Sequence, residues 1–130
     1  MLLPLRHPRL WLTIGWALVA LAVLTSLLPS RQMPETHVND KFEHFTAYAV
    51  MSLWFAGIYP RSRYTAIGLS LFAMGVGIEV AQGIMKMGRH AEFGDVVANS
   101  SGIAFALTAA WVGLGGWAQR VEAWIRTRRG

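Results

Sequence analysis

Residues 64–85 read YTAIGLSLFAMGVGIEVAQGIM, an apolar run that contains a single carboxylate, Glu79. A helix needs about 20 apolar residues to cross the hydrocarbon core of a bilayer, and this run has that length. A carboxylate at the centre of such a helix costs about 2.5–3.5 kcal/mol, and less near an interface. The segment therefore predicts a membrane-spanning helix, and Glu79 is the first candidate for a functional group.

Three more apolar segments accompany this one, and helices are expected at about residues 10–28, 41–59, 64–85 and 95–117. The chain of 130 residues is 54% hydrophobic and only 15% charged, which points to lipid as its solvent. No segment alternates strictly between polar and apolar residues, and lipid does not hydrogen-bond unpaired backbone groups, so strands are not expected. The predicted fold is all-α, an integral membrane four-helix bundle forming one domain, residues 1–130, with a basic tail at 118–130.

The first segment has one feature of a signal peptide, the cations Arg6 and Arg9 that precede it. Its apolar run exceeds the roughly 7–15 residues of a signal sequence and no A-x-A-like cleavage site follows, so we expect a retained helix. The chain contains no cysteine, which excludes disulfide bonds, thiolate metal sites and a catalytic thiol.

The charged residues divide unevenly between the two sides of a four-crossing arrangement. One side carries eight cations and one acid, Glu122, and the other carries four cations and six acids. By the positive-inside rule the arginine-rich side, with both termini, is cytoplasmic, and the loops at 29–41 and 86–95 lie outside. An aromatic belt is expected at the inner interface, formed by Trp11, Tyr59, Tyr64 and Trp117. The net charge of +5 is assigned to the inner leaflet surface rather than to nucleic acid.

Polar side chains gather at the outer ends of the second, third and fourth predicted helices. In chain order they are Asp40, Lys41, His44, Glu79, Gln82, Asp95 and Asn99. Helical spacing places those of each helix on one face. On the fourth helix the same face continues as a stripe of small residues from Gly102 to Gly113, which permits close helix contact. We therefore expect these polar groups to converge inside the bundle at its outer end.

A carboxylate inside the membrane is costly, so Glu79 needs either a positively charged partner or a proton. Arg89, in the loop above the polar groups, is the preferred partner, with Lys41 and His44 next. A plainer interpretation is structural: Glu79 and Gln82 hydrogen-bond between helices, and Asp95 caps the fourth helix as Asp40 caps the second.

Three motifs in order resemble the pattern of the VanZ-like family of small bacterial membrane proteins. They are D-K-x-x-H at 40–44, E-x-x-Q at 79–82 and R-x5-D-x3-N-x2-G at 89–102, and the resemblance covers about residues 38–115. It implies a multi-pass helical protein of the bacterial inner (cytoplasmic) membrane. The family's named member is associated with low-level resistance to the glycopeptide teicoplanin, so the resemblance also implies a role in envelope homeostasis or glycopeptide tolerance.

The leading functional hypothesis is an outward-facing pocket that binds a membrane lipid or a lipid-linked envelope precursor. Arg89 and Lys41 would meet an anionic head group, because guanidinium and ammonium groups bind phosphate. The other candidate ligand-binding residues are Asp40, Gln82 and Asn99.

A second hypothesis is an intramembrane enzyme acting on a lipid head group. Its candidate catalytic residues are Glu79, His44 and Asp95, with Glu79 or His44 as acid or base and Arg89 stabilising developing charge. A third is a structural polar network, or a proton-linked carrier using Glu79. A carrier of this size would need to oligomerise, and a homo-oligomer or a membrane-protein partner stays open.

No cofactor and no metal ligand is predicted. A metal site at His44, Glu79 and Asp95, with His90 as a further ligand, has no H-x-x-x-H or H-E-x-x-H spacing to support it.

Overall fold

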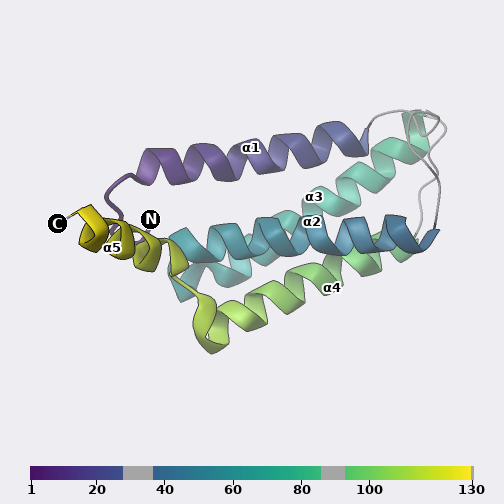
Figure 1. Ribbon diagram of the computed structural model, residues 1–130. Helices are drawn as coiled ribbons and strands as arrows, with labels where there is room; N and C mark the ends of the chain where they lie inside the picture. The colour runs from purple at the N-terminus through teal and green to yellow at the C-terminus, as the bar shows by residue number, and fades with distance from the viewer. Residues whose placement is uncertain (28–36, 86–92, 130) are drawn as a thin grey trace.

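The computed structural model describes residues 1–27, 37–85 and 93–129. Within these residues the fold is all-helical, as predicted, and consists of five α-helices (Figure 1). Their bounds are α1, Pro8–Ser26; α2, His37–Ile58; α3, Tyr64–Met85; α4, Phe93–Ala109; and α5, Trp117–Arg129. A 3₁₀ turn at Arg61–Arg63 joins α2 to α3, and a π-helical turn at Ala110–Leu114 follows α4.

Three segments of the described chain are long and apolar enough to cross a membrane. They are Pro8–Ser26, Arg61–Ile84 and Phe93–Leu114. The helix α2 is different, because charged residues occupy its first turns and it packs against α1, α3 and α4. Its buried side chains include Tyr48, Met51 and Phe55. Since neighbouring helices cover α2, most of its side chains contact other parts of the protein, so this helix needs fewer apolar residues than a helix that faces lipid.

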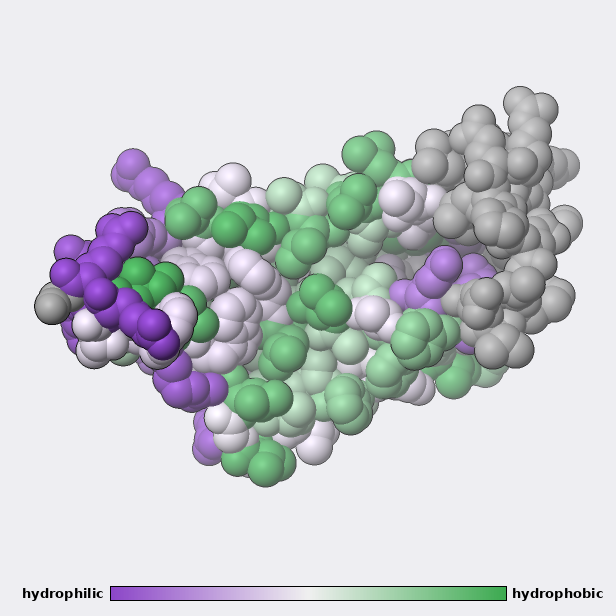
Figure 2. All heavy atoms as spheres, viewed as in Figure 1, coloured by the Kyte–Doolittle hydropathy of each residue, from purple (hydrophilic) through white to green (hydrophobic). Residues whose placement is uncertain are grey.

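The distribution of polar and apolar side chains differs from that in a water-soluble protein. Figure 2 shows apolar residues over the middle of the molecule. The large apolar side chains that are exposed include Leu24, Leu69, Phe72 and Phe105. The buried polar side chains are Ser52, Glu79, Gln82, Asp95 and Asn99. Soluble proteins seldom bury Asp or Glu, whereas membrane helices direct such groups into the protein interior. Together with the apolar segments, this distribution indicates a membrane protein.

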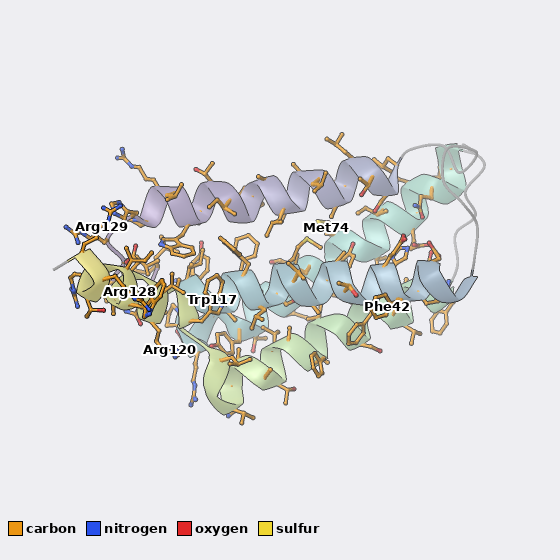
Figure 3. All side chains as sticks on the ribbon, in the orientation of Figure 1. Phe42, Met74, Trp117, Arg120, Arg128 and Arg129 are labelled. Carbon is orange, nitrogen blue, oxygen red and sulfur yellow. The ribbon has the colours of Figure 1, made fainter. Side chains whose placement is uncertain are left out.

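The two ends of the molecule differ in charge. Both termini lie at the same end (Figure 1), and that end is strongly hydrophilic (Figure 2). Arg120, Arg128 and Arg129 lie there, whereas Phe42 lies towards the opposite end (Figure 3). The arginine-rich end that the sequence predicts is therefore present, whereas five charged residues of the predicted opposite side lie outside the described residues: Arg31, Glu35, Lys86, Arg89 and Glu92.

The end of α4 differs from the sequence prediction of one helix over residues 95–117. The α-helix stops at Ala109, and two glycines then turn the chain: Gly115 is extended, and Gly116 has a φ of 69°, a conformation that glycine adopts readily. The turn carries Trp117 back to the bundle, where its indole N–H donates to the carbonyl oxygen of Leu53 at 2.8 Å. The predicted basic tail thereby becomes a further helix, α5.

The start of α2 also differs from the prediction. The helix begins at His37, so Asp40 lies in its first turn and is not the N-cap. The other helix bounds agree with the prediction to within about two residues, the usual uncertainty of helix ends.

Trp11 and Trp117, which are expected at the inner interface, pack against each other and against Trp54. The ring centroids of Trp11 lie 5.5 Å from those of Trp54 and of Trp117, and Trp54 lies 5.0 Å from Trp117. The indole N–H of Trp54 donates to the carbonyl oxygen of Trp11 at 3.0 Å. These contacts tie α1, α2 and α5 together at the arginine-rich end, opposite the polar cluster described next.

Candidate functional site

The α2–α4 contact determines where the polar groups meet. The buried side of α4 comprises Asp95, Asn99, Gly102, Ile103 and Ala106, so it includes the polar end of the stripe seen in the sequence. A Cβ atom on Gly102 would lie 2.3 Å from the carbonyl oxygen of Phe45 on α2. The two backbones are thus in contact, and the polar residues that precede Phe45 and Gly102 face each other.

Both helices begin at the same end of the bundle and carry an aspartate in the first turn, Asp40 in α2 and Asp95 in α4. The N-terminus of a helix has a partial positive charge, which stabilises a carboxylate by about 0.3–1 kcal/mol at an exposed position. The side chain of Asp95 is 7% exposed and that of Asp40 is 38% exposed. One carboxylate therefore lies inside the protein and the other reaches its surface.

Lys41 joins these two carboxylates. Its ammonium group donates to Oδ1 of Asp95 and lies 3.7 Å from Oδ2 of Asp40. The side chain is one-third exposed, so the ammonium is only partly withdrawn from solvent. It supplies a positive charge next to Asp95 and links the start of α2 to the start of α4.

His44 lies one turn deeper and contacts the other oxygen of each aspartate. Its Nδ1 is 2.9 Å from Oδ1 of Asn99, and because an amide oxygen only accepts hydrogen bonds, Nδ1 carries the proton and donates it. Its Nε2 then faces Oδ2 of Asp95 at 3.5 Å and Oδ1 of Asp40 at 3.7 Å. The imidazole is therefore held in one orientation, with Nε2 directed at two carboxylates.

Glu79 belongs to the same cluster. It is 5% exposed, and its carboxyl group lies near that of Asp95. Space for this group of side chains comes from Gly75, one turn earlier on α3, where a Cβ would lie 2.8 Å from Nδ2 of Asn99 and 3.3 Å from the hydroxyl of Tyr48. Three helices thus bring their polar groups together, as their spacing in the sequence predicts. We call this group the polar cluster, with members Asp40, Lys41, His44, Glu79, Asp95 and Asn99.

Gln82 occupies a different position from the cluster. Its Nε2 donates to the carbonyl oxygen of Ser26 at 2.5 Å. Ser26 is the last residue of α1, and the last carbonyls of a helix have no partner within it. Gln82 therefore connects α3 to the end of α1.

Two residues of the sequence hypotheses, Arg89 and His90, lie outside the described residues, so the predicted Arg89–Glu79 pair stays a prediction. Tyr48, by contrast, was not predicted as part of the site. It is 3% exposed and lies four residues after His44, on the same face of α2. That spacing was the available signal, but an aromatic residue in an apolar helix is usually a core residue.

The polar cluster contains hydrogen-bond acceptors, one ammonium group and one oriented imidazole, at the end of the bundle where α2 and α4 begin. Asp40 and Lys41 are its partly exposed members. Comparison with family models, with curated proteins and with solved structures finds no match for the chain.

Proposed function

We propose that the chain is a multi-pass protein of the bacterial inner membrane and a member of the VanZ-like family. In this proposal α1 to α4 form a four-helix bundle across the bilayer, with both termini in the cytoplasm. Three apolar segments and an outward-facing apolar surface support it. The arginine-rich end would be cytoplasmic by the positive-inside rule, which directs the polar cluster to the outer leaflet.

The function that we propose for the cluster is recognition of the head group of a membrane lipid or a lipid-linked envelope precursor. The observation that supports it is a largely buried polar cluster whose partly exposed members, Asp40 and Lys41, are close in sequence to large exposed apolar side chains. Phe42 is 67% exposed and lies next to Lys41 in sequence, and Phe93 is 83% exposed and lies two residues before Asp95. An amphiphile would place its head against Lys41 and its chains along this apolar surface.

The polar residues would contact different chemical groups of the lipid head. Lys41 is already close to two carboxylates, so it would meet a phosphate only together with another cation, for which Arg89 is the sequence candidate. Asp40, His44 and Asn99 would accept from or donate to hydroxyl and amine groups of the head. Such a role would fit envelope homeostasis or glycopeptide tolerance, which the family resemblance implies.

A second function, an enzyme acting on the same head group, is favoured by one specific contact. Asn99 fixes the imidazole of His44 through Nδ1, which leaves Nε2 as the atom that exchanges protons beside Asp95. Residues that act as a base in catalysis are usually oriented by a neighbouring group, as Asn99 orients His44 here. Glu79, whose carboxyl group lies near that of Asp95, would supply or store the second proton.

The proposal is tested by native mass spectrometry of the lipids retained by the purified protein. The variants are Lys41→Gln, Arg89→Ala and Glu79→Gln, and Glu43→Gln is the control, since Glu43 is an exposed acid on α2 outside the cluster. We expect the wild type and the control to retain one lipid class selectively, and Lys41→Gln and Arg89→Ala to lose it. The same lipid profile in all variants would contradict the proposal.

The Glu79→Gln variant separates binding from catalysis. If the protein is an enzyme, this variant keeps the lipid but no longer converts it, because the amide preserves shape and cannot exchange a proton. If the protein only binds, wild type and Glu79→Gln release the lipid chemically unchanged. Thermal unfolding in detergent is measured for each variant, and it identifies variants that lose the lipid because they are misfolded.

A further inference from the structure

Three side chains of the polar cluster place potential metal ligands around one point. Nε2 of His44 lies 3.5 Å from Oδ2 of Asp95 and 3.7 Å from Oδ1 of Asp40. One ligand atom from each of the three residues lies within 4.8 Å of the other two. Ligands held about 2.0–2.2 Å from a tetrahedral zinc ion are about 3.3–3.6 Å apart, so the two measured separations are close to those of a zinc site.

The second atom of each ligand group is held by a neighbour. Nδ1 of His44 donates to Asn99, while Oδ1 of Asp95 and Oδ2 of Asp40 face the ammonium of Lys41. Metal-binding histidines almost always donate their other ring N–H in this way, and metal-binding carboxylates are hydrogen-bonded through their outer oxygens. Lys41 therefore approaches the outer oxygens and leaves the three inner atoms directed at one another. This outer arrangement is independent of the three-atom distances.

The charges of these residues also favour a cation. The two aspartates carry two negative charges, and among the described residues in contact with them Lys41 supplies one positive charge. Lys41 balances one of these two negative charges, and a cation between Nε2 and the inner oxygens would balance the other.

We propose that Asp40, His44 and Asp95 bind a divalent metal ion, with Zn²⁺ as the ion that the ligand types and the two separations from His44 suit. The set contains one imidazole and two carboxylates, and three protein ligands leave a fourth position for water or for an oxygen of a bound molecule. Asp40, the most exposed ligand, marks the open side. Asp40 and His44 lie on α2, whereas Asp95 lies on α4, far along the chain, so the three ligands do not form a short motif in the sequence.

The inference is independent of which lipid the protein binds. If the lipid proposal is also correct, the open position is where a phosphate oxygen of the head group would meet the ion. Metal binding is therefore measured in detergent without added lipid, so that its result tests the metal proposal separately from the lipid proposal.

The experiment uses the full chain with any affinity tag removed, treated with a chelator and then dialysed against Zn²⁺ or Co²⁺. We expect one ion per chain by elemental analysis and a visible Co²⁺ absorption spectrum typical of four or five ligands. Asp40→Asn and His44→Gln should each lower the affinity at least tenfold, and Asn99→Ala should lower it about 10–100-fold, the usual effect of removing a group that orients a ligand. The control Glu43→Gln should bind as the wild type does.

A proton on Nε2 is the competing explanation of the same geometry, because an imidazolium would also face two carboxylates. In that case the wild type retains no ion above the level of the detergent blank and Co²⁺ shows only its aqueous spectrum. That result, or equal retention by wild type, Asp40→Asn and His44→Gln, would overturn the proposal. The Co²⁺ spectrum is recorded on the unaltered protein, so the test does not depend on the stability of a variant.

Discussion

Gly102 of α4 lies so close to Phe45 of α2 that a Cβ at this glycine would be 2.3 Å from the Phe45 carbonyl oxygen. Contact between helix backbones requires a residue without a side chain at the crossing point. The contact has a consequence for the site, because it sets the separation of His44 and Asn99, whose side chains meet at 2.9 Å just beyond it.

Gly102→Ala should therefore destabilise the protein by about 1–3 kcal/mol, the usual cost of overpacking a close contact. Thermal unfolding in detergent measures the effect. Gly77 provides the control, since it is a helical glycine with nothing within 4 Å of an added Cβ. Gly77→Ala should stabilise α3 by about 0.5–1 kcal/mol, because alanine is the better helix former. Equal effects of the two substitutions would show that α2 and α4 are not in contact at Gly102.

Asn99→Ala should cost about 1–3 kcal/mol, because it leaves the buried Nδ1–H of His44 without its acceptor. The imidazole should also lose its fixed tautomer, which nitrogen NMR of labelled histidine detects. Ser101→Ala is the control on the same helix: its exposed hydroxyl donates only to the carbonyl of Val97, and neither measurement should change. An unchanged histidine spectrum in Asn99→Ala would contradict the contact.

Gln82→Met keeps the size of the side chain and removes the hydrogen bond to Ser26. We expect a loss of about 0.5–1.5 kcal/mol and faster hydrogen exchange at the end of α1, with lipid retention unchanged. Ile84→Met, at a side chain 73% exposed on the same helix, should alter neither. If Gln82→Met instead lost lipid at unchanged stability, Gln82 would contact the ligand directly.

Glu122 ties α5 to the segment before α1 and gives the protein a pH dependence. Partial burial raises the pKa of Glu122, but the N–H groups of Arg6 and His7 and the indole of Trp11 donate to its carboxylate and outweigh burial. The resulting pKa lies below the usual 4.5. A lowered pKa means that the ionised group stabilises the folded state above pH 4.5, and that this contribution is lost as the pH falls through the folded value.

The measurement is the difference in melting temperature between wild type and Glu122→Gln across pH. The difference should be present at neutral pH and should shrink in acid, as the wild-type carboxylate takes up its proton. A difference that stays constant across the acidic range would mean that the charge of Glu122 does not hold the N-terminal segment.

The proposed topology is tested by cysteine labelling, since the chain has no cysteine of its own. Glu43→Cys, near the polar cluster, should react in intact cells with a maleimide that cannot cross the inner membrane. Arg128→Cys, in the basic helix α5, should react only after the membrane is permeabilised. The opposite pattern would reverse the orientation and put the polar cluster on the cytoplasmic side.

The sequence alone was sufficient for the helical class and for the positions of most helices, because the length of an apolar run and the turn of a helix are local properties. It placed His44, Glu79 and Asn99 on the correct faces for the same reason, since helical spacing orients each side chain on its own helix. It was wrong about the end of the fourth helix and missed α5, because the turn at Gly116 returns Trp117 to a distant acceptor on α2.

Tertiary structure alone decided which partner each polar group takes. Lys41 reaches Asp95 across 54 positions of the chain, His44 reaches Asn99 across 55, and Gln82 turns to Ser26 at the end of α1. Helical periodicity gives the face that a residue occupies, but not the rotation and height of one helix against another. Packing between the helices sets this rotation and height, here through the backbone contact at Gly102. The convergence of Asp40, His44 and Asp95 depends on both.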